Sequence, residues 1–155
     1  TTVGKHPVRC VEQLGEIAEA TESFTGLGFT KQLKETNDKQ SLAVTAVQLA
    51  ETLGAKGIVV ITRRGLMADY VTNCHPQKTR IFAFTNDSQT RRRLILNRNL
   101  TPYRTAFSSD PEKTLQTSFD VLKERAGLQS NDKVVVISDV LAGTGIEAIQ
   151  IRHLP

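Results

Sequence analysis

The sequence predicts an α/β domain in three layers, built on a mostly parallel five-stranded sheet with an antiparallel C-terminal edge strand. Short apolar segments rich in β-branched residues alternate with segments of helical periodicity, which is the pattern of βαβ units. The segment at residues 55–61 ends in the continuous apolar run Ile58-Val59-Val60-Ile61, as expected of a strand covered on both faces. The last apolar segment follows its predecessor too closely for a crossover helix, so we expect it to return antiparallel.

Local signals set the bounds of the expected elements. Asn37 or Asp38 caps one helix, Gly127 ends another, and Asn99 is expected in the left-handed conformation that follows a helix. Pro102 is tolerated only near the start of a strand or at a sheet edge. The expected strands lie at residues 55–61, 80–85, 101–107, 133–138 and 146–154. The expected helices of the sheet domain lie at residues 38–53, 66–73, 88–98 and 111–126.

Three segments follow one another along the chain. Residues 1–22 are expected to form a helix whose apolar stripe has nothing before it to pack on, which indicates a missing upstream piece. Gly, Ser and Thr interrupt any period in residues 23–37, so this segment is expected to be a linker. Residues 38–155 form the α/β domain. The apolar stripe of the first helix consists of Val8, Val11, Leu14 and Ala18.

The helix at residues 38–53 is apolar on two sides. One side carries Leu42, Ala46, Leu49, Ala50 and Leu53, and the other carries Ala43, Val44 and Val47. A helix with two apolar sides is expected to be buried on both. We therefore expect one side to cover the sheet and the other to contact a partner subunit in a homo-oligomer. A charge at Ala43 or Ala46 is then expected to break the oligomer.

The amino-acid composition and net charge favour some classes of function and argue against others. The 155 residues suffice for one domain with a real core, and the net charge of +4 favours anionic partners such as phosphorylated metabolites. Basic residues are interleaved with acidic ones and aromatic residues make up only 5%, which argues against nucleic-acid binding. No apolar run approaches the roughly 20 residues that span a membrane, and nothing resembles a signal peptide. Two distant cysteines match no metal or redox spacing, so we expect a cytoplasmic protein.

The first functional lead lies directly after the strand at residues 55–61. There the apolar run stops at Thr62, Arg63, Arg64 and Gly65, and the residues that follow are compatible with a helix. Ligands of open α/β sheets bind outside the carboxyl ends of the strands. A helix N-terminus offers free backbone amides, and an arginine offers paired donors to a phosphate. These four residues therefore form a candidate anion site.

Several motifs, taken in order, resemble the C-terminal domain of pyruvate kinase. They are Ala-x-x-Leu-Gly-Ala-Lys-Gly-Ile-Val-Val-Ile-Thr-x-x-Gly ending at Gly65, Pro76 followed by residues 81–86, residues 98–102, and Gly143-Thr144-Gly145 followed by residues 149–155. Residues 1–8 resemble the segment after that enzyme's last barrel strand, so residues 1–22 are expected to be the last helix of an upstream barrel domain. The resemblance covers nearly the whole chain and is weakest at residues 21–37.

This resemblance implies a parent enzyme that transfers phosphoryl from phosphoenolpyruvate to ADP in glycolysis. In the family that chemistry belongs to the barrel, with a lysine, an arginine, metal-binding carboxylates and Mg and K ions, all of which would precede Thr1. The chain itself shows no P-loop and no paired carboxylates beside a lysine. We therefore expect no catalytic residue, metal or cofactor in this chain. The resemblance implies two other roles for it, which are subunit contacts and allosteric binding of a sugar phosphate.

The effector loop of the family can be compared position by position with this chain. That loop is a hydroxyl-rich run similar to Thr-x-Ser-Gly-Arg-Ser. Thr62 and Gly65 match it, whereas Leu66 and Met67 occupy the positions of the arginine and the last hydroxyl and cannot donate hydrogen bonds from their side chains.

Two features decide whether this loop still binds an effector. Arg63 and Arg64 can supply the charge for a sugar phosphate or a nucleotide monophosphate such as AMP. Glu147 brings a negative charge that would oppose a phosphate. The alternative is a solvated loop edge that keeps only the family's geometry. The second wall of the expected site consists of Gly143, Thr144 and Gly145.

The remaining candidates are expected to be structural. The arginines at residues 91–93 point about 100° apart on a helix, so together with Arg98 they form a solvated face rather than one polyanion site. Cys74 and its neighbour in sequence point apart, Cys10 is expected in a core, and Asp139 lacks a catalytic partner. The histidines are too scattered to share a metal ion. They are His6, His75 and His153.

Two function classes remain open. The first is the regulatory and assembly domain of a pyruvate kinase. The second is a stand-alone, non-catalytic protein of the same fold that binds a phosphate or another small molecule. A small hydrolase is a third possibility, for which the sequence offers no nucleophile–base pair. The reading frame before Thr1 would distinguish the first class from the second.

Overall fold

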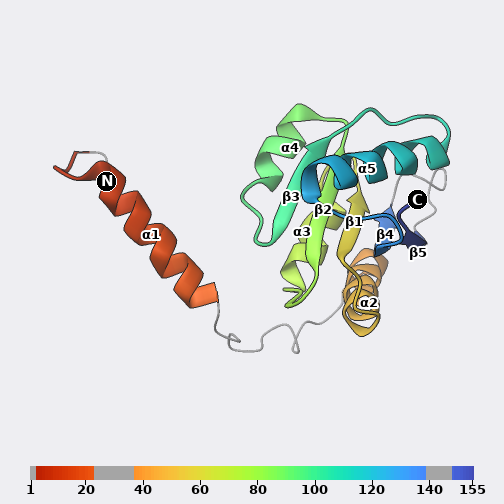
Figure 1. Ribbon diagram of the computed structural model, residues 1–155, viewed down its shortest axis with the longest axis horizontal. Helices are drawn as coiled ribbons and strands as arrows, with labels where there is room; N and C mark the ends of the chain where they lie inside the picture. Colours follow the sequence, from red (N-terminus) through yellow and green to blue (C-terminus); the bar gives the residue numbers. More distant parts are fainter. Residues whose placement is uncertain (1–2, 23–36, 139–147) are drawn as a thin grey trace. The chain divides into compact units, whose positions relative to one another are not determined.

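A computed structural model gives the fold and describes residues 3–22, 37–138 and 148–155 (Figure 1). The chain divides into two compact units, Thr1–Leu33 and Lys34–Pro155. The first unit contributes one described helix, α1 (Pro7–Glu22). The second unit contains every strand and the other four helices found among the described residues.

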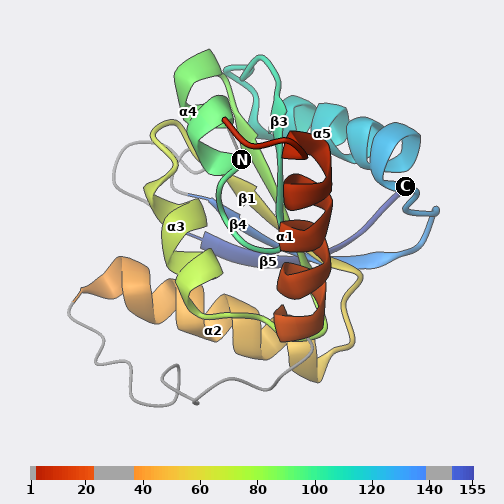
Figure 2. The same cartoon turned by 90° about the vertical axis from the view of Figure 1, so that its left-hand side faces the viewer.

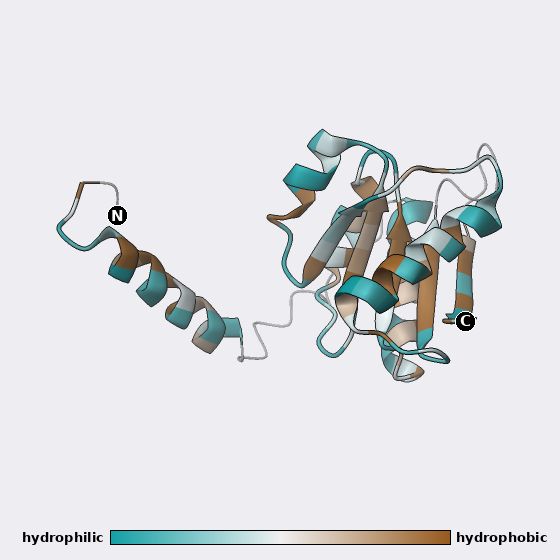
Figure 3. Ribbon diagram, turned by 45° about the horizontal axis from the view of Figure 1, so that its top comes forward, coloured by the Kyte–Doolittle hydropathy of each residue, from teal (hydrophilic) through white to brown (hydrophobic). Residues whose placement is uncertain are grey.

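Helix α1 carries its apolar residues on one stripe, and that stripe is exposed. Val8, Val11, Leu14 and Ile17 recur every three residues and retain 54% to 70% of their accessible surface. Cys10 is also exposed, so the prediction that it is a core residue is wrong. The hydrophobic stripe and the polar remainder of the helix are visible in Figure 3. An apolar stripe of this width is typical of a helix that covers another element.

The second unit is built on the five-stranded sheet that the sequence predicts. Its strands are β1 (Gly57–Ile61), β2 (Arg80–Thr85), β3 (Leu100–Arg104), β4 (Lys133–Ser138) and β5 (Ala148–His153). They lie in the order β3-β2-β1-β4-β5, with the first four parallel and β5 antiparallel to β4. The apolar runs pair in register, since Val59 lies opposite Phe82 on one side and Val136 on the other. The predicted fold class is confirmed.

Four helices cover the two faces of this sheet. They are α2 (Asp38–Thr52), α3 (Leu66–Asn73), α4 (Ser88–Leu94) and α5 (Pro111–Ala126). Alternate residues of β1 point to opposite faces: Ile58 and Val60 join the cluster beneath α2, α3 and α4, whereas Val59 and Ile61 join the cluster beneath α5. Figure 2 shows the strands between α5 and the other three helices. The three predicted layers are therefore present.

Caps and left-handed residues define the helix ends. The Asn37 side chain accepts a hydrogen bond from Gln40 N at 3.0 Å and is the N-cap of α2. Asn99 (φ +55°) adopts the predicted left-handed conformation, and Gly127, which ends α5 as predicted, is also left-handed (φ +73°). Pro102 lies on β3, which is an edge strand, as the sequence requires.

Helix α4 and strand β3 differ from their predicted bounds. The helix ends at Leu94 rather than near residue 98, and the strand begins at Leu100 and ends at Arg104. The register of β3 is set by β2, since Ile81 pairs with Leu100 and donates its N–H to Asn99 O at 3.0 Å. The intervening residues make the turn that this register requires.

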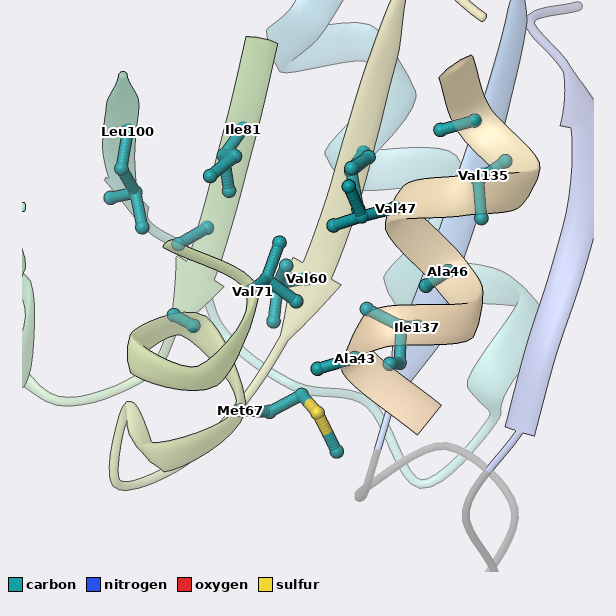
Figure 4. Close-up of a cluster of buried hydrophobic side chains, with 14 of the residues drawn as sticks. Ala43, Ala46, Val47, Val60, Met67, Val71, Ile81, Leu100, Val135 and Ile137 are labelled. Carbon is teal, nitrogen blue, oxygen red and sulfur yellow. The ribbon is translucent and has the colours of Figure 1, made fainter. Parts of the chain in front are cut away.

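Helix α2 buries its small apolar residues within its own unit and leaves its larger ones partly exposed. Ala43, Ala46 and Ala50 are fully buried and Val47 is 7% exposed, and all four join the cluster of buried residues that α2 and α3 share with the sheet (Figure 4). The half-buried members of the two predicted sides are Leu42, Val44, Leu49 and Leu53. Small residues let α2 approach the sheet and α3 closely. Because Ala43 and Ala46 belong to the core, a charge at either position would disturb folding, so these positions do not test subunit contacts as the sequence led us to expect.

Candidate functional site

The topology gives the sheet one switch point, between β1 and β4. The chain leaves β1 through α3 and α4 to β2 and β3 on one side, and α5 then returns it to β4 on the other side. Ile61 and Ser138 end these two neighbouring strands in register. Loops diverge beyond the carboxyl ends of strands at such a point, and this is where open α/β sheets bind ligands.

The loop after β1, residues 62–65, lies at this switch point and is held by its backbone. Thr62 is fully buried and donates its N–H to Phe84 O at 2.9 Å. Its hydroxyl accepts a hydrogen bond from Gly65 N at 3.1 Å, which closes the loop. Gly65 adopts φ +82°, a conformation that favours glycine, and precedes the first residue of α3. We call residues 62–65 the β1 loop.

Arg63 and Arg64 lie at the surface of the β1 loop, and neighbouring elements bind their backbone carbonyls. Arg63 O accepts a hydrogen bond from Thr85 Oγ1 at 3.1 Å, and Arg64 O accepts one from Arg93 Nη2 at 3.0 Å. Both arginine side chains are exposed. The loop therefore exposes two guanidinium groups, while hydrogen bonds from β2 and α4 hold its backbone in place.

Helix α3 begins directly after the loop, and its first residues take different environments. Leu66 is 43% exposed, whereas Met67 is fully buried in the core beside α2 (Figure 4). The Met67 side chain, at the position where the sequence comparison expected the last hydroxyl, therefore serves core packing. The first turn of α3 leaves backbone amides without helical partners, and such amides together with the helix dipole favour an anion.

A side-chain network that the sequence analysis missed joins α3 to α4. Arg93 Nη1 donates to Asp69 Oδ2 at 2.8 Å and Oδ1 at 3.1 Å, and Asn97 Nδ2 donates to Asp69 Oδ1 at 2.8 Å. Asp69 and Arg93 are 24 positions apart and belong to different helices, so no local sequence pattern predicts that they pair. We call Asp69, Arg93 and Asn97 the α3–α4 clamp.

The second predicted wall lies outside the described residues. Gly143, Thr144 and Gly145 belong to the segment 139–147, as do Asp139 and Glu147. The described chain ends on one side at Ser138, which is 3% exposed, and resumes at Ala148. The described part of the candidate site is thus the β1 loop, the start of α3 and the end of β4.

Three of the other candidate residues, Arg92, Arg93 and Cys74, have local partners. Arg92 Nε donates to Ser88 O, while Arg93 belongs to the clamp, so these neighbouring arginines point to different places as predicted. Cys74 Sγ donates to Tyr70 O at 3.2 Å.

Within residues 3–22, 37–138 and 148–155, no group of three His, Cys, Asp or Glu side chains could hold a metal ion. No helix in these same ranges has the length and apolarity to cross a bilayer.

The fold and the β1 loop define a class of protein, a three-layer α/β domain with a candidate anion site at the switch point of its sheet. A family model described as "Pyruvate kinase, alpha/beta domain" matches residues 40–150. The chain belongs to this family. The resemblance on which the sequence analysis relied is therefore confirmed.

Individual relatives agree with this assignment. Pyruvate kinase isozyme A of Ricinus communis, named as chloroplastic, is 35% identical over 116 residues, which is 75% of this chain and 19% of that protein. Pyruvate kinase isozyme G of Nicotiana tabacum, also named as chloroplastic, is 28% identical over 157 residues, which is 99% of this chain and 27% of that protein. The chain spans about a fifth to a third of the curated relatives it matches.

Solved structures show the same fold. The structure titled "Cryptosporidium parvum pyruvate kinase in complex with ADP" aligns with a TM-score of 0.71 and 22% identity. The alignment covers 79% of this chain and 25% of that one. Similarity at this level of identity supports the architecture of the sheet and its helices.

Proposed function

We propose that this chain is the C-terminal part of a pyruvate kinase, and that it binds a phosphate-bearing effector and holds subunits together without catalysing phosphoryl transfer. The parent enzyme would transfer phosphoryl from phosphoenolpyruvate to ADP in glycolysis, with Mg and K ions in a barrel domain outside this chain. Membership of the family supports the parent reaction. One observation carries the effector role: the β1 loop presents Arg63 and Arg64 at the switch point, beside the start of α3.

The chemistry of the β1 loop suits a phosphate monoester. Two guanidinium groups can each donate paired hydrogen bonds to phosphate oxygens, and the first turn of α3 adds backbone donors. A sugar phosphate or AMP is the expected effector. The side chains of Leu66 and Met67 add no donor, so affinity would depend on the arginines more than on hydroxyls.

Calorimetric titration tests the effector role. Wild-type protein would be titrated with glucose 6-phosphate and AMP, and the titrations repeated on the double variant Arg63→Ala, Arg64→Ala. Loss of charge-assisted hydrogen bonds is expected to weaken binding at least about tenfold. The matched control is Arg91→Ala, Arg92→Ala, which removes the same charge from α4 and should bind like wild type. Absence of binding to wild type would exclude the effector role.

Subunit assembly is a second proposed role, and strand β5 supports it. This strand lies at the end of the sheet order, and edge strands pair readily with another chain. Ile149 is half-buried against the cluster beneath α2, and Ile151, on the same face, is 48% exposed. We therefore propose that the homo-oligomer forms through helix α2, within residues 38–53, together with the exposed face of β5.

Light scattering after size exclusion tests this interface. Ile151→Lys is expected to reduce the oligomer to smaller species, because a charge would be buried between subunits. Leu96→Lys is the matched control, since Leu96 is 88% exposed in the connection between α4 and β3. Equal masses for wild type and Ile151→Lys would contradict an interface at this position.

Helix α1 is proposed to be the last helix of an upstream barrel domain. Its exposed apolar stripe supports this proposal, because such a stripe normally packs against another element. The match to the Nicotiana tabacum isozyme G covers 99% of the chain and so includes α1. The alternative is a stand-alone, non-catalytic binding protein of the same fold. Sequencing the transcript upstream of Thr1 distinguishes them, because only the first would encode a barrel.

A further inference from the structure

The Arg93 side chain contacts both the β1 loop and the clamp carboxylate, Asp69. Its Nη2 donates to Arg64 O at 3.0 Å, and its Nη1 donates to both oxygens of Asp69. A planar guanidinium can bind two acceptors in different directions at once, which an ammonium group on a flexible stem does less well. Arg93 therefore joins α4 to the loop and to α3 simultaneously.

The close approach of Arg93 depends on Gly65. A Cβ built on Gly65 would overlap Arg93 Nη2 and would lie 3.1 Å from Thr90 Cγ2. The absence of a side chain at this position allows the guanidinium to lie directly against the loop. The left-handed φ of Gly65 and the guanidinium of Arg93 together determine the path of the backbone from Arg64 into α3.

Arg93 also compensates a charge that would oppose an anion. Asp69 is in the first turn of α3, near the amides expected to bind phosphate. A free carboxylate there would repel a phosphate, whereas the pair with Arg93 is formally neutral. Arg93 thus combines a geometric contact with a local charge balance.

We propose that Arg93 is a positioning residue of the anion site: it holds the β1 loop in the conformation that presents Arg63, Arg64 and the start of α3 to a phosphate. The part of this inference that concerns phosphate rests on the proposed effector role. The part that concerns the conformation of the β1 loop is independent of that role, because Arg93 contacts the loop in the unliganded chain. The two parts can therefore fail separately.

Amide hydrogen exchange of the unliganded 155-residue chain tests the hold on the loop. Gly65 N–H, which donates to Thr62 Oγ1, and Asp69 N–H, which donates to Gly65 O, report its closure. In Arg93→Ala both amides are expected to exchange about tenfold faster, because a charge-assisted hydrogen bond is lost. Amides of β1 should keep their rates, and Arg91→Ala should match wild type throughout. Unchanged rates at Gly65 and Asp69 would overturn the inference.

Phosphate binding provides the second measurement, with inorganic phosphate and glucose 6-phosphate as probes. Arg93→Ala is expected to bind about tenfold more weakly, although neither Arg63 nor Arg64 is changed. Arg93→Lys keeps the positive charge beside Asp69 but loses the planar guanidinium that binds two acceptors at once. It should therefore restore only part of the phosphate affinity and of the protection from exchange. This milder variant also serves if Arg93→Ala does not fold.

The two measurements separate the possible failures. Faster loop exchange with unchanged phosphate affinity would overturn the positioning role. Absence of phosphate binding to wild type would instead overturn the effector role, and the exchange rates would then decide alone whether Arg93 holds the loop.

Discussion

Gly65 and Arg93 are in direct contact, although they belong to different elements and are far apart in sequence. The guanidinium of Arg93 occupies the space that a Cβ on Gly65 would take, and donates a hydrogen bond to the preceding carbonyl, Arg64 O. The shape of the β1 loop therefore depends on a glycine before α3 and on an arginine from α4. This contact leads to the first prediction.

Gly65→Ala is expected to destabilise the domain by about 2 to 4 kcal/mol, as measured by urea unfolding. The variant forces a side chain into a left-handed conformation and also displaces Arg93, and each effect costs free energy. Gly127→Ala is the matched control, since Gly127 has φ +73° but nothing within 4 Å of its Cβ position. It should lose only about 1 kcal/mol. If both variants lost the same free energy of unfolding, displacement of the Arg93 side chain would contribute nothing to the effect of Gly65→Ala.

Gly57→Ala is expected to be destabilising for a different reason. Its Cβ would lie 2.5 Å from Cε2 and 2.7 Å from Cδ2 of Phe82, which is fully buried on the neighbouring strand. Overpacking of this kind typically costs about 1 to 3 kcal/mol. Phe82→Leu should reduce the cost of Gly57→Ala, and a double-mutant cycle in urea would measure the coupling. Additive losses would indicate that the ring is not the obstacle.

Asp87 is the N-cap of α4, and its contribution to the stability of the folded state is expected to depend on pH. The backbone N–H and the hydroxyl of Thr90 hold the pKa of the Asp87 carboxyl below its ordinary value of 3.8. A carboxyl with a lowered pKa stabilises the folded state above its unfolded pKa, and this contribution is lost as pH falls through the folded pKa. Asp87→Ala should therefore lower the urea midpoint by a constant amount above about pH 5, and by a shrinking amount below pH 3.8.

Asn86→Ala provides the comparison for this pH series. It changes an exposed neighbour without removing the carboxylate, so its effect on the urea midpoint should not vary with pH. An Asp87→Ala effect that is equally large at pH 3 and pH 7 would refute the role assigned to the ionised cap.

Ala46→Glu is expected to unfold the domain rather than merely to separate subunits. Ala46 has no accessible surface and lies on α2 within the buried cluster that includes α3 and the sheet, where an unpaired carboxylate cannot be solvated. A loss above about 4 kcal/mol is expected. Gln48→Glu, at an exposed position of the same helix, should change stability by less than about 0.5 kcal/mol. Circular dichroism during urea unfolding distinguishes them; a folded Ala46→Glu monomer would restore the original subunit-contact interpretation.

Local patterns predicted the parts of the fold that local forces determine. The strands were found because runs such as that of β1 are apolar on both faces, and the N-cap of α2 because Asn37 offers a side-chain acceptor before the helix. The end of α4 was missed because Ile95 and Leu96 continue an apolar pattern while remaining 54% and 88% exposed. Apolar residues at the surface are common, so periodicity alone cannot place such an end.

The candidate site divides in the same way. Thr62 and Gly65 were recognised because a strand end, a hydroxyl and a glycine are adjacent in sequence. The contribution of Arg93 depends on two crossovers that bring α4 beside α3, which no local pattern encodes. The burial of Met67 likewise follows from the packing of α3 against α2.

An NMR titration of the chain with glucose 6-phosphate tests the central claim, an anion site at the switch point of the sheet. The account predicts saturable shifts of the backbone amides of residues 62–69, which disappear in the double variant Arg63→Ala, Arg64→Ala. Shifts confined to other surfaces, or none at millimolar ligand, would contradict it.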